Sequence, residues 1–77
     1  MKVEILFFGQ LVDRTQCNKL VVENPGSISA LRAMVEEQFP ALAQATFTIA
    51  LNNKMVASDE QIPENAIIAF LPPFSGG

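Results

Sequence analysis

Residues 67–73 read Ile-Ile-Ala-Phe-Leu-Pro-Pro, and the fold depends on this stretch. Five consecutive apolar residues after a polar loop form a strand that is long enough to lie in the centre of a sheet. Proline has no backbone N–H to donate, so Pro72 and Pro73 cannot continue the hydrogen-bonded ladder. The sequence therefore predicts a central strand over 67–71 and a chain that leaves the sheet at Pro72.

Upstream of this strand, hydrophobic periodicity separates one helix from several further strands. Alternating residues over 2–8 have the period of two that is typical of a strand. Three more strands are predicted over 19–23, 47–51 and 55–56. Ser27 is a predicted helix N-cap, and apolar residues then recur at helical spacing until Pro40, which disfavours helical geometry in the residue before it. The segment 9–18 is predicted as a polar loop with at most a turn of helix at 11–12.

The element order β-β-α-β-β-β, with the helix between the second and third strands, indicates an α+β fold in two layers. Together with a central last strand, this order predicts a β-grasp, in which one main helix covers one face of a mixed sheet. A chain of 77 residues makes a single domain. We expect the β-grasp domain to span 1–71 and a flexible tail to span 72–77.

Composition excludes several classes of function. A net charge of −3 with only five lysines and arginines lacks the basic patch of a nucleic-acid-binding protein. With no histidine and a single cysteine, Cys17, the sequence has no Cys/His metal cluster and no internal disulfide. No apolar run reaches the ~20 residues of a membrane-spanning helix. We therefore expect a soluble, cytoplasmic protein without a metal site, and we interpret Cys17 as incidental.

The sequence ends in Ser75-Gly76-Gly77, directly after Pro72-Pro73-Phe74. Glycine packs no side chain and loses much conformational freedom on ordering, so these glycines add nothing to a core. They provide a thin end with a free α-carboxylate, which can enter a slot that any Cβ would block. We therefore predict that the tail is the working part of the molecule and that the domain holds it.

Leu6 and Phe8 are candidates for contact with a partner protein. The residues that alternate with them, Phe7 among them, are predicted to lie in the core under the helix. Leu6 and Phe8 then belong to the opposite face, beside the tail, where an exposed apolar patch would mark a partner site. The alternative is that the loop from Leu11 covers Phe8.

Two stretches of the sequence resemble a known family. Leu6-Phe7-Phe8-Gly9-Gln10 near the start and the segment 70–77, with its Pro-Pro-apolar-Ser-Gly-Gly ending, are similar to the MoaD/ThiS family of ubiquitin-like sulfur carriers. The MoaD group of this family contains the small subunits of molybdopterin synthase. The similarity extends over the whole chain, and Ala50-Leu51-Asn52 matches a small-apolar-Asn turn of the family. Before the last strand, where the family often has Gly-Asp, this chain has Asn65-Ala66, and Asn tolerates the left-handed conformation that glycine would supply.

The resemblance implies a carrier cycle centred on Gly77. An E1-like adenylating enzyme would use ATP to join the Gly77 carboxylate to AMP, and a sulfur donor would convert the adenylate into a thiocarboxylate. In the large subunit of molybdopterin synthase the sulfur would pass to a pterin precursor to build the dithiolene of the molybdenum cofactor. The family implies a two-plus-two heterotetramer, no bound cofactor and no activity of the small subunit alone. The tail residues that would bind in the large subunit are Pro72, Pro73, Phe74, Ser75 and Gly76.

Other functions would use the same tail. The sulfur carrier could instead serve the thiazole of thiamine or the thiolation of a tRNA base. The activated Gly77 could also be joined to lysine side chains, as in a ubiquitin-like modifier. A plain interaction domain, whose tail is never activated, is a further alternative.

Overall fold

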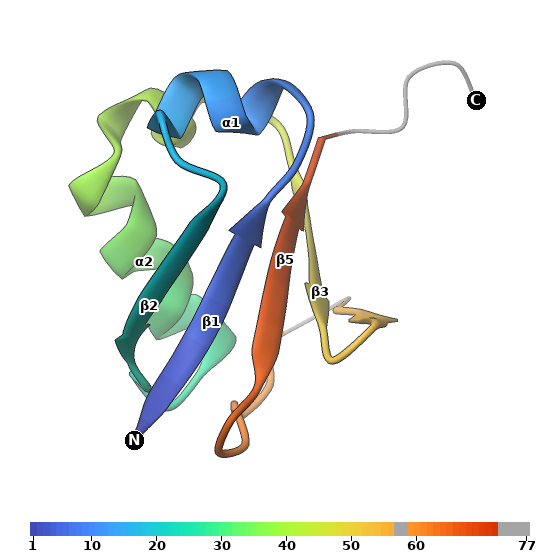
Figure 1. Ribbon diagram of the computed structural model, residues 1–77. Coiled ribbons are helices and arrows are strands. Elements are labelled where there is room, and N and C mark those ends of the chain that lie inside the picture. Colours follow the sequence, from blue (N-terminus) through green and yellow to red (C-terminus); the bar gives the residue numbers. More distant parts are fainter. Residues whose placement is uncertain (57–58, 73–77) are drawn as a thin grey trace.

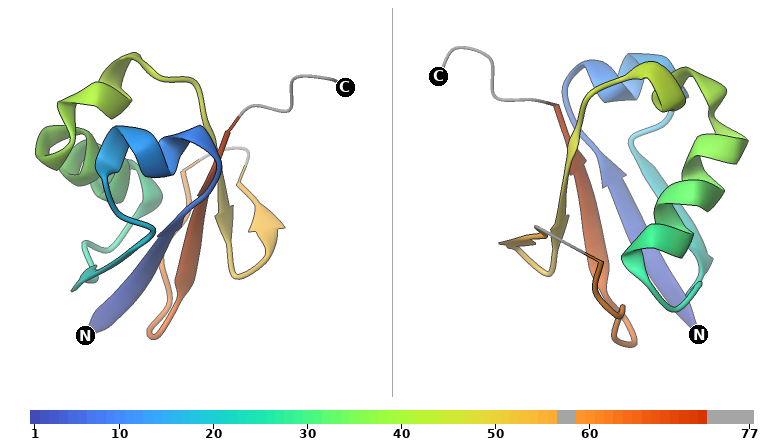
Figure 2. Two further views of the ribbon diagram at one scale, coloured as in Figure 1. Left: turned by 45° about the horizontal axis from the view of Figure 1, so that its top comes forward. Right: turned by 180° about the vertical axis from the view of Figure 1, so that it is seen from behind.

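The computed structural model describes residues 1–56 and 59–72. Along the chain the elements are β1 (Lys2–Phe7), α1 (Gln10–Thr15), β2 (Lys19–Glu23), α2 (Ile28–Gln38), the 3₁₀ helix η1 (Pro40–Gln44), β3 (Thr48–Leu51), β4 (Lys54–Met55) and β5 (Ile67–Leu71). The five strands of this described part form one sheet in the order β2-β1-β5-β3-β4. The helix α2 packs on one face of the sheet, and no described element covers the other face (Figure 1, Figure 2).

The strand β5 occupies the middle of the sheet, as its apolar sequence predicts. It pairs in parallel with β1, with Glu4 opposite Ile67 and Phe7 opposite Phe70. On its other side it pairs antiparallel with β3, and β1 pairs antiparallel with β2. The sheet is therefore mixed, and the predicted α+β fold, a β-grasp with one main helix on one face, is confirmed.

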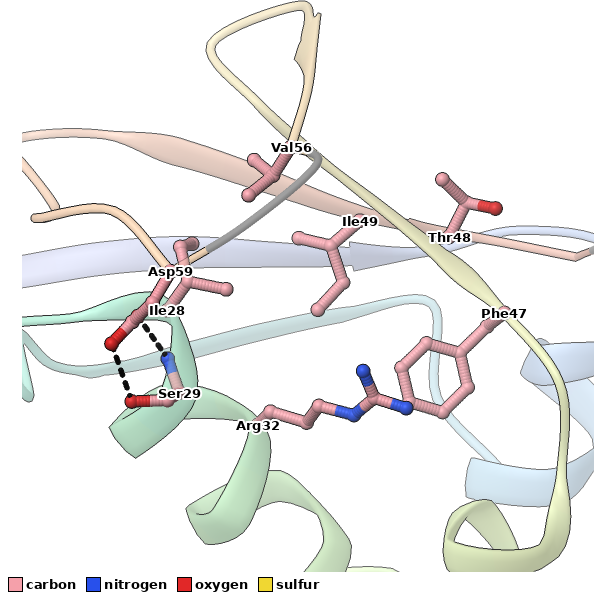
Figure 3. Close-up of a pocket in the computed structure, with 8 residues that line it drawn as sticks. All are labelled: Ile28, Ser29, Arg32, Phe47, Thr48, Ile49, Val56 and Asp59. Atoms are coloured by element: carbon pink, nitrogen blue, oxygen red, sulfur yellow. Dashed lines mark hydrogen bonds between the residues drawn. The ribbon is translucent and has the colours of Figure 1, made fainter.

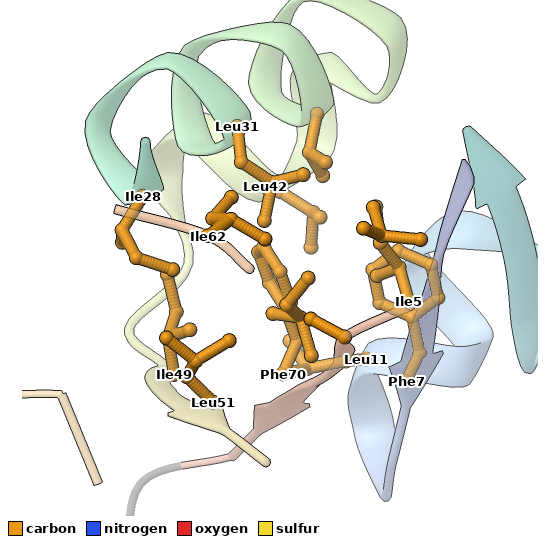
Figure 4. Packing of buried hydrophobic residues seen from close by; sticks show 14 residues of the cluster. Ile5, Phe7, Leu11, Ile28, Leu31, Leu42, Ile49, Leu51, Ile62 and Phe70 are labelled. Carbon is orange, nitrogen blue, oxygen red and sulfur yellow. The ribbon is translucent and has the colours of Figure 1, made fainter. Parts of the chain in front are cut away.

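The core lies between the sheet and the helices, and alternate residues of the central strands supply much of it. Val3, Ile5 and Phe7 of β1 and Ile68 and Phe70 of β5 are at most 2% exposed. The ring centres of Phe7 and Phe70 lie 5.4 Å apart, a distance typical of favourable aromatic pairs. Figure 4 shows the labelled side chains of the strands meeting those of the helices in one continuous cluster.

The helix α2 begins and ends where the sequence indicates. The side chain of Ser27 accepts a hydrogen bond from the backbone N–H of Ala30 at 3.3 Å, so it caps the first turn. The helix ends at Gln38 because Phe39 precedes Pro40 and adopts a φ of −125° and a ψ of 82°, outside the helical region. The residues that α2 buries are Ile28, Leu31 and Val35.

The segment 9–18, predicted as a loop with at most one turn, contains the short helix α1. Leu11 anchors this helix in the core and is 1% exposed. The hydroxyl of Thr15 donates to the carbonyl of Leu11 at 3.0 Å, and Gln16 ends the helix with a left-handed φ of 61°. The prediction of irregular structure for this segment was wrong. Its polar composition indicated a loop, whereas the burial of one leucine, Leu11, holds a helix there.

Asparagine residues form the tight turns. In the turn between β3 and β4, Asn52 and Asn53 have positive φ values of 49° and 73°. The φ of Asn65 is 58°, which confirms that this asparagine adopts the left-handed conformation expected before the last strand. Asn52 also holds the start of β5, because its Oδ1 accepts the N–H of Ile67 at 2.9 Å.

Residues 59–62 fasten the first turn of α2 to the rest of the domain. The carboxylate of Asp59 accepts the backbone N–H of Ser29 at 2.8 Å and the hydroxyl of Ser29 at 2.9 Å (Figure 3). The N–H of Ile28 donates to the carbonyl of Glu60 at 2.8 Å. The bonds from Ser29 lower the pKa of Asp59 below its usual value of 3.8, because they stabilise the charged carboxylate.

We expect the stability contributed by Asp59 to disappear in acid. A carboxylate whose pKa is lower in the folded protein stabilises the fold above its unfolded pKa, about 4, and this contribution is lost as the pH falls through the folded pKa. The free energy of unfolding of Asp59→Asn should therefore be lower than that of the wild type at neutral pH, and the difference should shrink in acid. Urea denaturation over a pH series measures it, and a difference that stays constant into acid would contradict the assignment.

Candidate functional site

Two parallel strands end side by side where the tail begins. Beyond the paired residues of β1 and β5, the N–H of Phe8 donates to the carbonyl of Phe70 at 3.2 Å. After β1 the chain turns at Gly9 into α1, whereas after β5 it continues to Pro72 (Figure 1). The tail therefore starts from the centre of the sheet, next to the corner between β1 and α1.

Only the first residue of the predicted tail is described, and Pro72 is half-buried. The division into a domain over 1–71 and a tail over 72–77 therefore stays a prediction. The same holds for the roles predicted for residues outside the described part of the chain, namely Pro73, Phe74, Ser75, Gly76 and Gly77.

The predicted partner residues Leu6 and Phe8 both lie away from the helix-covered face. Leu6 stands opposite Lys19 of β2 and Ala69 of β5 and is partly buried. Phe8 is 44% exposed, so the loop that follows β1 does not cover it. This exposure agrees with the interpretation of Phe8 as part of an exposed patch, and its contact with a partner stays a prediction.

The open face of the sheet carries a wider apolar surface than these two residues. Glu4 lies opposite both Val21 and Ile67, and residues directly opposite in a ladder share one face. Val21 is 50% exposed, Met55 60% and Ile67 46%. We call this surface the open-face patch, and it consists of Leu6, Phe8, Val21, Met55, Ile67, Ala69 and Leu71. Exposed apolar patches of this kind mark sites of interaction.

Sequence reasoning did not identify Val21, Met55 and Ile67 as part of such a surface. Runs such as 20–22 and 67–71 are apolar on both faces, so their composition does not tell which residues face the helix. Ile67 can be assigned to the open face once its neighbour Ile68 is placed in the core, because successive side chains of a strand point to opposite faces.

Charged side chains also lie on the open face, along β1 and β2. Lys19 and Glu4 form an ion pair with an N–O distance of 3.7 Å, and Lys2 pairs with Glu23 at 3.6 Å. Glu23 also accepts a hydrogen bond from the N-terminal ammonium of Met1 at 2.6 Å, and this bond, with the charges of the ammonium and Lys2, lowers the pKa of Glu23 below 4.5. Such exposed pairs contribute little to stability. The pair of Lys2 and Glu23 lies at the end of the patch, whereas Glu4 stands between Val21 and Ile67 and separates Val21 from the rest of it.

A cavity of about 300 Å³ lies on the other side of the sheet, between α2 and β3 (Figure 3). The guanidinium carbon of Arg32 lies 4.9 Å from the centre of the Phe47 ring, and its Nε donates to Glu36 at 3.2 Å. Asp59 and Ser29 line the cavity near the first turn of α2. The charged groups of the cavity are therefore already paired, Arg32 with Glu36 and Phe47, and Asp59 with Ser29.

The described residues supply no metal site. Within 1–56 and 59–72, no three Cys, Asp or Glu side chains come together as they would to hold an ion. Neither α1 nor α2, the α-helices of that part, has the length and apolar composition needed to span a bilayer. Cys17 is a half-buried free thiol whose backbone N–H donates to the hydroxyl of Thr15 at 3.3 Å.

A mixed sheet in the order β2-β1-β5-β3-β4 with one main helix on a single face defines a β-grasp protein, and its central strand ends at Leu71, directly before the predicted tail. The sequence matches the ThiS family over residues 5–77. This chain therefore belongs to the ThiS family, and the resemblance to the MoaD/ThiS carriers is confirmed.

Solved structures of other proteins share this fold. A protein described as molybdopterin converting factor subunit 1 of Pyrococcus furiosus gives a TM-score of 0.86 at 15% identity, covering 95% of this chain and 98% of that chain. SAMP1 of Haloferax volcanii gives 0.82 at 18% identity, with 100% of both chains covered. A chain of the complex between subunits 1 and 2 of the molybdopterin-converting factor of Helicobacter pylori gives 0.76 at 26% identity, again with 100% of both covered.

Phe7 and Phe8 form a matched pair that tests how the two faces of the sheet are assigned. Because Phe7 is 2% exposed, Phe7→Ala should lower the free energy of unfolding by about 3–5 kcal/mol. Because Phe8 is 44% exposed, Phe8→Ala should lower it by about 1 kcal/mol or less. Urea denaturation measures both values, and equal losses would mean that Phe8 packs in the core.

Proposed function

We propose that this chain is the sulfur-carrier subunit of a molybdopterin synthase. In the proposed cycle the carboxylate of Gly77 is adenylated, converted into a thiocarboxylate, and gives its sulfur to a pterin precursor to form the dithiolene of the molybdenum cofactor. The observation that carries the proposal is that the match to the ThiS family runs to Gly77 and includes the Gly-Gly ending. The Helicobacter pylori neighbour, a chain of a complex of molybdopterin-converting factor, supports the choice of pathway.

The proposed chemistry requires no side chain of the carrier. A free carboxylate is a poor acyl donor because its leaving group would be oxide. Attack of a Gly77 carboxylate oxygen on the α-phosphorus of ATP releases pyrophosphate and makes AMP the leaving group. The sulfur donor then displaces AMP. The catalytic groups, and the use of ATP, belong to the partner enzymes, so we expect the chain alone to be inactive and to bind no cofactor.

The residues of the tail suit delivery of an acyl group into a partner. Glycine at 76 and 77 allows a narrow channel and a close approach of the backbone to a nucleotide. Pro72 and Pro73 favour an extended chain, which reduces the entropy lost when the tail docks. We assign Phe74 and Ser75 to contacts with the wall of the partner's channel.

We assign the open-face patch to binding of the large subunit and of the E1-like adenylating enzyme. The patch includes Leu6 and Phe8 and lies next to the start of the tail, so one partner can hold the domain and the tail together. Exposed apolar side chains together with charged pairs on the same face have the composition of a protein interface. We propose a two-plus-two heterotetramer with the large subunit, in the cytoplasm, where ATP and reduced thiols are available.

A ubiquitin-like modifier is the second candidate function, and the fold similarity to SAMP1 and the small archaeal modifier protein of Methanosarcina acetivorans favours it. The activated Gly77 would then be joined to lysine side chains of target proteins. Membership of the ThiS family also suits a sulfur carrier for thiamine thiazole or tRNA thiolation. Intact mass separates carrier from modifier, since a carrier exchanges one oxygen for sulfur and a modifier forms lysine-linked adducts.

Changes at Gly77 should abolish thiocarboxylate formation without affecting the fold. We expect this result for Gly77→Val and for a variant with one alanine added after Gly77, because a side chain or an extra residue would keep the carboxylate out of the adenylating site. Intact mass after incubation with the adenylating enzyme, ATP and sulfur donor measures the exchange, and the melting temperature controls for folding. An extended variant that still gains sulfur would refute the proposal.

A charge in the open-face patch should weaken binding of the large subunit. Phe8→Asp replaces an exposed apolar side chain of the proposed interface by a carboxylate, and we expect the Kd to rise by about tenfold or more. The matched control is Ala33→Asp, which adds the same charge at an exposed position of α2, on the opposite side of the sheet. Calorimetric titration measures both, and equal affinities of the two variants would contradict the assignment.

A further inference from the structure

We infer that Gly9 positions the start of the tail, because the ring of Pro72 packs directly against its backbone. The parallel register of β1 and β5 places Glu4 opposite Ile67 and Phe7 opposite Phe70. The same register, continued by two residues, brings Gly9 opposite Pro72. Because Pro72 has no N–H, the ladder ends there, and the contact that remains between the two chains is steric.

The contact leaves no room for a side chain at residue 9. A Cβ built on Gly9 would lie 2.8 Å from Cγ of Pro72 and 3.5 Å from its Cδ. Carbon atoms in favourable contact are about 3.5–4.0 Å apart, so a methyl group on Gly9 must displace the proline ring. The ring is half-buried at this position, directly on the backbone of Gly9.

The backbone of Gly9 is held in a conformation that suits glycine. Its φ of 60° and ψ of −138° are close to the mirror image of polyproline geometry, which L side chains avoid. Hydrogen bonds fix the chain on both sides of this residue. The N–H of Phe8 donates to Phe70 at 3.2 Å, and the N–H groups of Leu11 and Val12 donate to the carbonyls of Phe8 and Gly9, both at 3.1 Å.

The fixed backbone of Gly9 determines where Pro72 lies. The position of Pro72 in turn sets the point and the direction from which the tail starts. Pro72 transmits this placement because its ring restricts its own φ. Gly9 touches no reacting atom, so it is a positioning residue. If one partner holds the domain and the tail together, a shift at Pro72 changes the path that the tail must take to the adenylating site. A misplacement of 1 Å at the reacting atoms can cost about 100-fold in rate.

This inference rests on the proposed activation of Gly77, and Gly26 provides a matched control for its test. Gly26 also has a positive φ, 103°, but a Cβ there meets no atom within 4 Å. It lies at the other end of the sheet, next to Asn24, whose N–H donates to the carbonyl of Met1. Gly26→Ala therefore strains the backbone without touching the tail.

The test compares Gly9→Ala with Gly26→Ala in adenylation by the E1-like enzyme, followed as ATP–pyrophosphate exchange below both melting temperatures. We expect both variants to be less stable than the wild type, and only Gly9→Ala to lose kcat, by about 10- to 100-fold. Binding through the open-face patch should be retained. Equal kcat values for Gly9→Ala and Gly26→Ala would overturn the inference.

D-alanine at position 9, introduced by chemical synthesis, separates the contact with Pro72 from strain in the backbone. It matches the positive φ of residue 9, and its methyl points away from the position of an L side chain. We expect it to retain wild-type kcat, whereas Gly9→Ala loses it. A D-alanine variant that loses as much kcat as Gly9→Ala would mean that the contact with Pro72 is not the cause of the loss.

A readout without any enzyme keeps this inference separate from the proposed function. In the NMR spectrum of the wild type we expect nuclear Overhauser effects between the α protons of Gly9 and the ring protons of Pro72. Gly9→Ala should shift the amide resonances of 74–77, and Gly26→Ala should leave them unchanged. A wild type that is never adenylated but shows these nuclear Overhauser effects would refute the proposed function alone. A wild type without them would refute the inference that Gly9 positions Pro72.

Discussion

At the centre of the sheet, β1 and β5 pair in parallel, and this pairing places the features on which the proposed function depends. Parallel strands require a long crossover, and here the crossover contains α2, which is thereby held against one face. Because the two strands run in the same direction, they end together, and the tail starts beside the corner at Gly9. A slip of one residue in this register would turn Phe70 outward and Ile67 inward, and would exchange the core with the open-face patch.

Both faces of β5 are apolar, for different physical reasons. On the helix side, Phe70 packs between Phe7 and Phe47 with ring centres 5.4 and 5.0 Å away, so burial there stabilises the folded chain. On the open side, Ile67 and Val21 remain about half exposed and contribute far less to folding. Their apolar area is available for burial against a partner. A partner that covers this face leaves the packing of α2 undisturbed, so binding requires no rearrangement of the core.

Signals that act within a few residues allowed much of the fold to be predicted from the sequence. Ser27 and Pro40 bound α2, Pro72 ends β5, and Asn65 adopts the left-handed conformation expected of it. Where α1 lies, only a short turn of helix at 11–12 was predicted, since the full helix depends on the burial of one leucine by distant parts of the chain. The same limit applies to the site. Leu6 and Phe8 were found by alternation along one strand, whereas the rest of the open-face patch and the contact between Gly9 and Pro72 depend on a register between strands from opposite ends of the chain.

Sulfur carriers and ubiquitin-like modifiers would share one activated intermediate, the acyl adenylate of the terminal glycine. What distinguishes them is the nucleophile that the next partner presents, a sulfur donor in one case and a lysine amine in the other. A reactive group made only of backbone cannot select between these nucleophiles by its own chemistry. Selection must then depend on which partner binds the domain and on where that partner finds the carboxylate. Under the proposed function, the first requirement would fall to the open-face patch and the second to the start of the tail at Pro72, so these two regions beside the end of β5 would decide the pathway together.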